Sequence, residues 1–281
     1  AAKRPEPIPV YAEMSSVNPV ILLEGALKTN RDAIARDLAN SLALGAGQFC
    51  TNPGLVLTLD NKDGQSFLRS FSAELSKLKP ATMLNKNIYD AYIQRTDKLK
   101  DNKEIATITN FPQEASPERY EAQPSAFVVG AGDYMADKQL GEEVFGPSTL
   151  IILNKDSEQL TEVLHSLEGQ LTVTVHATDA DEGRMKAVVD IITQKAGRII
   201  YGGYPTGVEV SHSMQHGGPF PSTTDPRSTS VGTAAIYRFV RPVTFQEFPD
   251  HLLPEALQNK NPLHIVRLVD GKWNNSPIEP R

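Results

Sequence analysis

Short apolar runs alternate with amphipathic segments along this chain. The runs at residues 19–23, 54–59 and 149–153 are aliphatic and β-branched, a composition typical of strands that are buried on both faces. The segments between the runs repeat apolar residues three and four positions apart, as residues 160–167 do, which predicts helices that cover a sheet. This alternation predicts an α/β fold with a mostly parallel sheet flanked by helices.

Three more strands and two helix starts follow from the same pattern. The strands are expected at residues 126–129, 171–175 and 198–201. One helix is expected to start at Thr29 and another after Asp156, because Thr and Asp side chains accept hydrogen bonds from the first free N–H groups of a helix. The last two strands and the helix between them have the outline of a crossover between parallel strands.

The C-terminal part of the chain has a different character. Gly, Pro, Ser and Thr dominate residues 202–232, which predicts a long loop region with a functional or interfacial role. The partly alternating residues 237–245 contain a proline and predict an edge strand, where another chain can pair. We therefore expect one domain at residues 1–203, and a loop-rich segment with this C-terminal strand at residues 204–281.

The composition excludes several classes of function. A formal net charge of −6 and an isoelectric point near 5.6 argue against nucleic acid or an anionic membrane surface as partner. No apolar run approaches the length of a bilayer span. The single cysteine, Cys50, excludes an internal disulfide framework and predicts a reducing, cytoplasmic setting.

Cys50 is the first residue whose surroundings suggest chemistry. It lies between the helix predicted from Thr29 and the strand at residues 54–59, and small residues at positions 45–47 let another backbone or a ligand approach closely. A cysteine in such a place is either a buried thiol that packs as a small hydrophobe or a nucleophile. The pattern alone leaves both interpretations open.

Four motifs carry a resemblance to a known family. Residues 47–54 read Gly-Gln-Phe-Cys-Thr-Asn-Pro-Gly and resemble the cysteine signature of the aldehyde dehydrogenase superfamily. Residues 11–19 resemble the family's glutamate motif, and residues 142–147 its Glu-x-Phe-Gly-Pro motif. Residues 215–224 resemble the Gly-rich loop near its substrate entrance. The four occur in the family's order over almost the whole chain, so they form a far more specific signal together than any one does alone.

The resemblance implies a mechanism and a set of site residues. Cys50 would be the nucleophile that attacks an aldehyde, with its backbone N–H as one oxyanion donor, and Glu13 would be the general base that activates water. Glu143 would hold the nicotinamide ribose of NAD or NADP, and Phe145 would pack against that cofactor. Residues 1–203 would then be the catalytic domain, and the strand at residues 237–245 would join subunits into a homo-oligomer, a dimer or tetramer.

Two departures from the family pattern limit this expectation. The family's usual glycine pair after the glutamate is replaced by Ser15 and Ser16. The family's oxyanion asparagine, its phosphate-binding glycine turn and its ribose-binding lysine have no counterpart in this chain. We therefore expect a C-terminal catalytic half that binds NAD or NADP weakly and turns over little by itself. Within the family, the motif spellings are most similar to members that oxidise α-ketoglutaric semialdehyde.

Other interpretations predict different behaviour. The chain could be a non-enzymatic α/β interaction module of the same ancestry, in which Cys50 only packs. It could also be a cysteine hydrolase in which His216 is the base, which predicts ester or amide cleavage without a nicotinamide cofactor. His212 and His216 are four residues apart, but they lie in a Gly- and Pro-rich loop rather than a helix, so no metal site is expected.

Overall fold

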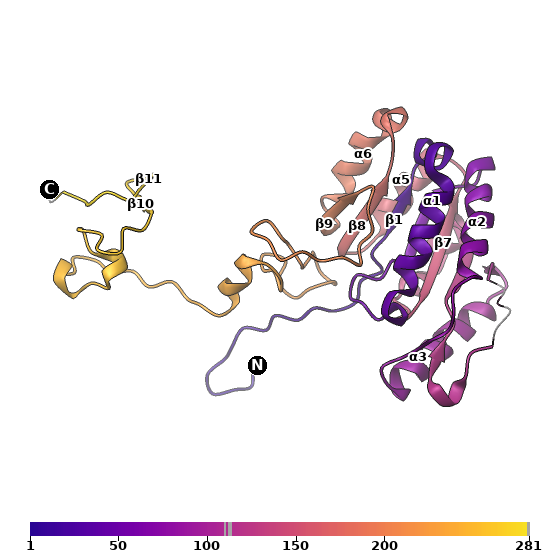
Figure 1. Cartoon of the computed structure of the whole chain (residues 1–281), viewed down its shortest axis with the longest axis horizontal. Coiled ribbons are helices and arrows are strands. Elements are labelled where there is room, and N and C mark those ends of the chain that lie inside the picture. Colours follow the sequence, from indigo (N-terminus) through magenta and orange to yellow (C-terminus); the bar gives the residue numbers. More distant parts are fainter. Residues whose placement is uncertain (110, 112–113, 280–281) are drawn as a thin grey trace. The chain divides into compact units, whose positions relative to one another are not determined.

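The computed structural model describes residues 1–109, 111 and 114–279, and the chain divides into two compact units, residues 1–238 and 239–281. The first unit contains a seven-stranded sheet in the order β4-β6-β7-β2-β1-β8-β9 (Figure 1). All neighbours are parallel except β4 and β6, which confirms the predicted mostly parallel sheet. The strands are β1 (Val20–Leu22), β2 (Leu55–Leu59), β4 (Ala106–Thr107), β6 (Ser125–Gly130), β7 (Ser148–Asn154), β8 (Gln170–His176) and β9 (Ala196–Tyr201).

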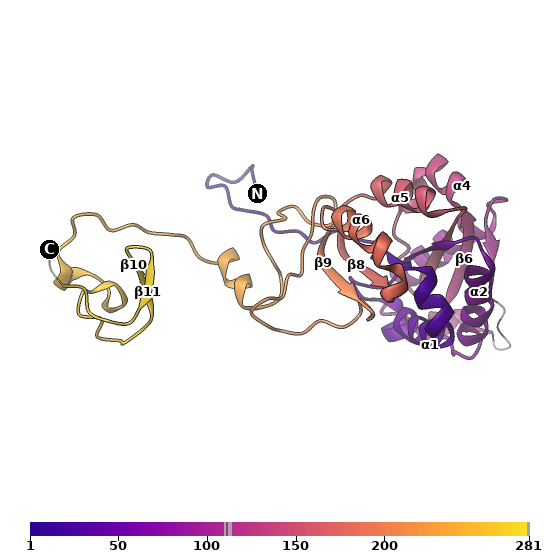
Figure 2. The ribbon, with the colours of Figure 1, turned by 90° about the horizontal axis from the view of Figure 1, so that it is seen from above.

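Helices cover both faces of this sheet, as Figures 1 and 2 show. Val20 and Leu22 of β1 pack with α1 and α2 on one face, whereas Ile21 packs on the other face with α5 and α6. Both sets of side chains are buried, which explains why the strands read as unbroken apolar runs. The helices are α1 (Glu24–Ala43), α2 (Lys62–Leu75), α3 (Lys86–Lys100), α4 (Ala131–Ala136), α5 (Ser157–Ser166) and α6 (Glu182–Ile192).

The two predicted helix starts had different outcomes. Asp156 caps α5 as predicted, because its carboxylate accepts a hydrogen bond from the Gln159 N–H at 2.9 Å. The element α1 begins at Glu24, and its backbone leaves the helical region at Asn30, where φ is −132° and ψ is 19°, so the predicted start at Thr29 falls at a kink inside α1 rather than at its first residue. Its first turn is satisfied by a distant partner: the Asp181 carboxylate accepts a hydrogen bond from the Gly25 N–H at 2.9 Å. A cap that comes from so far along the chain leaves no local signal.

The loop region belongs to the first compact unit, which ends at Arg238. The assignment of residues 1–203 to a catalytic domain stays a prediction. The predicted edge strand at residues 237–245 is not formed. Thr233–Arg238 is a 3₁₀ helix, and residues 239–245 have no regular secondary structure. A strand exists only through hydrogen bonds to a neighbouring strand, and within the described residues this segment has none to pair with. Its pairing with a second chain stays a prediction.

The second unit contains the antiparallel strands β10 (Arg267–Val269) and β11 (Lys272–Asn274). In the first unit, β3 (Ala81–Thr82) and β5 (Glu121–Ala122) form a second small sheet. Among the described residues, none of the helices combines the length and the apolar character that crossing a membrane requires.

Three of the four sequence motifs lead directly into strands of the sheet. Residues 11–19 end where β1 begins, residues 47–54 end at β2, and residues 142–147 end at β7. Because these strands are parallel, their amino ends meet at one edge of the sheet. The backbones there lie so close that a Cβ on Gly47 would be 2.3 Å from the carbonyl carbon of Gly146. The fold therefore gathers the motifs at the amino edge.

We predict that Gly47→Ala lowers the free energy of unfolding by roughly 1–3 kcal/mol, because the added methyl group overlaps the backbone at Gly146. Gly47 also has a φ of +65°, which a residue with a Cβ adopts only with strain. The control is Gly132→Ala in α4, where a Cβ would meet no heavy atom within 4 Å. Urea denaturation measures both variants. Equal stability of the two would contradict the close approach.

Candidate active site

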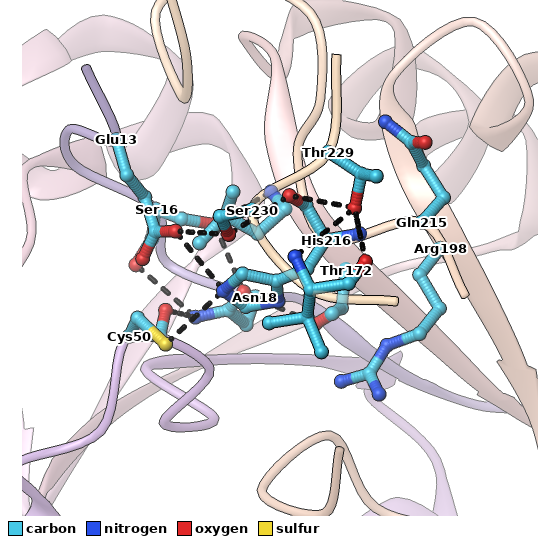
Figure 3. Close-up of polar contacts among 12 residues, drawn as sticks. Glu13, Ser16, Asn18, Cys50, Thr172, Arg198, Gln215, His216, Thr229 and Ser230 are labelled. Atoms are coloured by element: carbon cyan, nitrogen blue, oxygen red, sulfur yellow. Dashed lines mark hydrogen bonds and ion pairs between the residues drawn. The ribbon is translucent and has the colours of Figure 1, made fainter. Parts of the chain in front are cut away.

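Three side chains from distant parts of the first unit meet at the amino edge of the sheet (Figure 3). The Sγ atom of Cys50 lies 3.4 Å from Nε2 of His216. The same ring nitrogen lies 3.1 Å from Oε2 of Glu13. Ser230 donates a hydrogen bond to that Glu13 oxygen at 3.3 Å. A thiol, a titratable ring and a carboxylate are therefore in direct contact.

Asn18 holds the backbone around Cys50 in place. Its side chain is fully buried, and its Nδ2 donates hydrogen bonds to the carbonyl oxygens of Cys50 at 2.9 Å and Asn52 at 3.0 Å. Asn18 has a φ of +46°, in the left-handed region that asparagine tolerates better than most residues. This conformation ties the turn after Cys50 to the start of β1.

Gln170, the first residue of β8, holds the segment that leads from Glu13 into the sheet. Its side-chain oxygen accepts hydrogen bonds from the N–H groups of Val17 at 2.8 Å and Asn18 at 3.1 Å. It also accepts one from the hydroxyl group of Ser16 at 3.0 Å. A single buried side chain thereby accepts from three donors in the interior, of which the hydroxyl group of Ser16 also has the Asn18 side-chain oxygen within reach at 2.9 Å.

The loop region delivers His216 to this cluster. Glu13 and Thr223 form an antiparallel bridge. The bridge pairs the segment of the glutamate motif, residues 11–19 (the glutamate segment), with the loop region at residues 202–232. The His216 N–H donates to the Thr229 hydroxyl at 2.8 Å, and its carbonyl accepts from the Ser230 N–H at 2.9 Å. The loop also packs tightly on β8, since a Cβ on Gly218 would lie 2.0 Å from the Gln170 carbonyl oxygen. These contacts leave the imidazole ring little freedom.

The contacts within the cluster shift two pKa values. The hydrogen bond with Cys50, followed by that with Glu13, raises the pKa of His216 from its ordinary value of 6.5 to about 9, against the opposing effect of burial. The pKa of Glu13 is lowered, chiefly by its hydrogen bond with His216. The side chain of His216 is 4% exposed and that of Glu13 is 29% exposed, so the carboxylate lies on the solvent side of the ring.

Glu143 lies beside the same segment, in a cleft that Ser15, Ser16 and Gln170 also line. Burial raises the pKa of Glu143, while hydrogen bonds with the Ser15 side chain and the Ser16 backbone oppose the shift. Phe145 is 38% exposed and is not among the described residues that line this cleft. Of the four residues predicted from the motifs, the structure thus brings Cys50 and Glu13 into one cluster and places Glu143 close to them.

The cluster does not make a convincing metal site. Glu13, Cys50 and His216 each offer one ligand atom, and these atoms lie within 4.8 Å of one another, a donor set that zinc accepts. A zinc-bound histidine almost always donates its second ring N–H to a further partner. Nδ1 of His216 is buried and has no hydrogen-bond partner among the described residues. We assign no metal to these residues.

Sequence reasoning missed three members of this arrangement. His216 entered only as the base of a hydrolase, although its position directly before Gly217 and Gly218 in a family motif was a usable signal. Asn18 entered only as part of the glutamate motif at residues 11–19, and Gln170 carried no signal of its own. Asn18 acts on backbone carbonyl groups 32 and 34 positions away, and Gln170 contacts Asn18 from 152 positions away.

No protein-family model matches the chain. Over 272 residues, 97% of this chain, it is 47% identical to alpha-ketoglutaric semialdehyde dehydrogenase 2 of Azospirillum brasilense, of which it covers 51%. It is 41% identical over 276 residues to alpha-ketoglutaric semialdehyde dehydrogenase of Acinetobacter baylyi, with 96% of this chain and 51% of that protein covered. The chain thus spans about half the length of the curated relatives it matches.

Solved structures share the fold at lower identity. Proline utilization A of Bradyrhizobium japonicum superposes with a TM-score of 0.68 at 23% identity, covering 85% of this chain and 24% of that one. The Delta-pyrroline-5-carboxylate dehydrogenase of Mycobacterium tuberculosis bound with NAD superposes with a TM-score of 0.66 at 15% identity, covering 86% and 45%. Gamma-glutamyl-gamma-aminobutyraldehyde dehydrogenase of Burkholderia cenocepacia has a TM-score of 0.66 at 16% identity, covering 81% and 45%.

The sheet and its flanking helices have the fold of an aldehyde dehydrogenase catalytic domain. The chain belongs to the aldehyde dehydrogenase superfamily, as the motif spellings predicted. Its relatives at 47% and 41% identity are alpha-ketoglutaric semialdehyde dehydrogenases, which confirms the predicted group within the family.

We predict that Asn18→Ala lowers the free energy of unfolding by about 1–3 kcal/mol, because it leaves the buried carbonyl groups of Cys50 and Asn52 without this donor. The matched control is Asn40→Ala, an exposed asparagine on α1, which should leave stability nearly unchanged. Urea denaturation of both variants decides the matter. An Asn18→Ala chain as stable as the control would mean that these hydrogen bonds contribute little.

We predict that the stability difference between the wild-type chain and His216→Phe narrows as the pH rises from 6.5 to about 9. The pKa of His216 is raised in the folded chain, so the stabilisation from its protonated ring is fully present below pH 6.5 and is lost as the pH passes about 9. Denaturation curves of both proteins across this range provide the measurement. A difference that stays constant with pH would show that His216 does not titrate with the expected pKa.

Proposed function

We propose that this chain supplies the nucleophile and the general base of an enzyme that oxidises an aldehyde to its carboxylate, using NAD or NADP. The preferred aldehyde is α-ketoglutaric semialdehyde, in keeping with the names of its two sequence relatives. The observation that carries the proposal is the contact cluster of Cys50, His216 and Glu13 at the edge of the sheet. A buried imidazole between a thiol and a carboxylate is an arrangement for moving protons at a nucleophile.

The chain's own groups would act in sequence. The thiolate of Cys50 attacks the aldehyde carbon, a C–S bond forms, and the carbonyl oxygen takes the negative charge as a thiohemiacetal. The backbone N–H of Cys50 donates a hydrogen bond to that oxygen. After oxidation to the thioester, Glu13 takes a proton from the attacking water. The lowered pKa of Glu13 keeps its carboxylate ionised at neutral pH, which a general base requires.

The residues beside Glu13 fit a nicotinamide cofactor, which when bound supplies the hydride acceptor. Glu143, Ser15 and Ser16 line one cleft, and Ser15 is only two residues after the proposed base, Glu13. The carboxylate of Glu143 is an acceptor for ribose hydroxyl groups, and the serine hydroxyl groups offer both donors and acceptors. Glu143 would therefore hold the ribose of NAD or NADP, and Phe145 would contribute an apolar surface nearby.

The contact between Cys50 and His216 also favours a second function, that of a cysteine hydrolase. In hydrolase triads the third residue holds the ring nitrogen that does not face the nucleophile. Here Glu13 and Cys50 share Nε2, and Nδ1 has no hydrogen-bond partner among the described residues. This difference makes the hydrolase the weaker proposal. An interaction module in which Cys50 only packs is weaker still, because the thiol is part-exposed and hydrogen-bonded.

We predict that α-ketoglutaric semialdehyde protects Cys50 from alkylation by iodoacetamide, because thiohemiacetal formation consumes the thiolate and needs no cofactor. The matched ligand is α-ketoglutarate, whose carboxylate replaces the aldehyde and should not protect. Glu13→Gln should keep the protection, since the base acts only in the later hydrolysis. With NAD or NADP added, slow formation of NADH or NADPH should disappear in Cys50→Ala.

Two outcomes would contradict the proposal. The first is equal labelling in the presence of the semialdehyde and of α-ketoglutarate. The second is protection without any reduction of NAD or NADP at saturating concentrations. If Cys50-dependent ester or amide cleavage accompanied that second result, the hydrolase would be the better description.

A further inference from the structure

The reaction steps proposed above do not use His216, yet its ring contacts the two side chains that they do use, Cys50 and Glu13. Its Nε2 atom is within hydrogen-bond distance of the Cys50 sulfur at 3.4 Å and of a Glu13 oxygen at 3.1 Å. These contacts bridge 166 residues of sequence between Cys50 and His216. A mobile histidine on the surface can make such contacts by chance, but the side chain of His216 is only 4% exposed. Its backbone N–H and carbonyl groups are both hydrogen-bonded, to Thr229 and Ser230.

The charged groups around the thiol are few. Glu13 and His216 touch it or its partner, and the part-buried guanidinium of Arg198 on β9 acts on it through the electrostatic field. Arg198 donates hydrogen bonds to the carbonyl oxygens of Gly207 and Pro205, both at 2.7 Å. Since arginine keeps its proton in proteins, it can stabilise a thiolate but cannot receive the thiol proton. Glu13 is the second acceptor, but its Oε2 atom already accepts a hydrogen bond from Ser230 at 3.3 Å and lies 3.1 Å from Nε2 of His216.

We propose that His216 is the base that takes the thiol proton of Cys50 and so prepares the nucleophile. In this step the S–H bond of Cys50 breaks and an N–H bond forms at Nε2, leaving a thiolate and an imidazolium, with no change of oxidation state. The new imidazolium faces two negative groups, the thiolate and the Glu13 carboxylate. Both favour the charged ring, in line with the raised pKa of His216. The place of this step in aldehyde oxidation rests on the proposed function; the proton transfer itself does not.

In this arrangement the Glu13 carboxylate has two roles, one before and one after the attack on the aldehyde. Before the attack on the aldehyde, its carboxylate stabilises the imidazolium and thereby the thiolate. After the thioester has formed, the sulfur carries no charge, and the same carboxylate is the acceptor for a proton from water. One residue can do both because it lies on the solvent side of the ring, at 29% side-chain exposure.

The test measures the rate of iodoacetamide labelling against pH, without aldehyde or cofactor. Cys50 is the only cysteine, so every signal comes from it. We expect His216→Phe to be labelled roughly tenfold more slowly than wild type at neutral pH, because an unassisted thiol ionises around pH 8.5 and is only a few per cent thiolate at pH 7. Its rate should rise with pH as that of an unassisted thiol does. The ultraviolet absorbance of the thiolate should fall in parallel.

Three further variants sharpen the result. His212→Phe changes an exposed histidine of the same loop and should label like wild type. His216→Gln can keep a hydrogen bond but does not titrate, so it should lose as much reactivity as His216→Phe if the proton transfer matters. Glu13→Gln keeps the base and loses the carboxylate, so its rate should lie between those of wild type and His216→Phe.

Wild-type labelling rates and pH profiles in both His216→Phe and His216→Gln would overturn the proposal. A loss in His216→Phe alone, with wild-type behaviour in His216→Gln, would also overturn it, because the ring would then only position Cys50. Since the assay contains neither aldehyde nor NAD or NADP, failure of the proposed oxidation is seen separately, in the protection and reduction experiments.

Discussion

The site depends first on one buried polar network, the hydrogen bonds among Asn18, Gln170 and the backbone around Cys50. Gln170 accepts from the backbone that leads out of the glutamate segment, and Asn18 donates to the backbone that carries the cysteine. Each of these groups is costly to bury without a partner, and the network supplies those partners. It ties β1, β2 and β8 together at their amino ends, beside Cys50.

The amino edge is an unusual place for a site in an open α/β sheet, because ligands commonly bind beyond the carboxyl ends of such strands. Here the segments that precede β1, β2 and β7 carry the motifs, and the loop after β9 folds back over the start of β8. Close backbone approach at Gly47 and Gly218 makes this possible. Glu143 lies beside the glutamate segment, in the cleft that Ser15 and Ser16 also line.

Within the cluster, a single ring nitrogen organises the charges. His216 lies between a thiol and a carboxylate, and its pKa rises because both neighbours favour the charged ring. The pKa of Glu13 is lowered in turn, chiefly by its hydrogen bond with His216. Mutually shifted titratable groups beside a thiol are typical of sites that carry chemistry. The loop that supplies His216 belongs to the same compact unit as the sheet, which explains how a segment without helix or strand holds a ring to within hydrogen-bond distance.

The sequence by itself determined the elements that depend on near neighbours. Apolar runs predicted β1, β2, β6, β7, β8 and β9, because burial on both faces demands that composition, and Asp156 predicted the start of α5 through contacts within one turn. Motif spelling singled out Cys50, Glu13, Glu143 and Phe145. Only the tertiary structure decided that α1 begins at Glu24, that residues 239–245 form no strand, and that His216 meets Cys50. The reason is common to all three: each depends on a partner from a distant part of the chain or on the lack of one, and no local pattern of residues records which distant groups the folded backbone brings together.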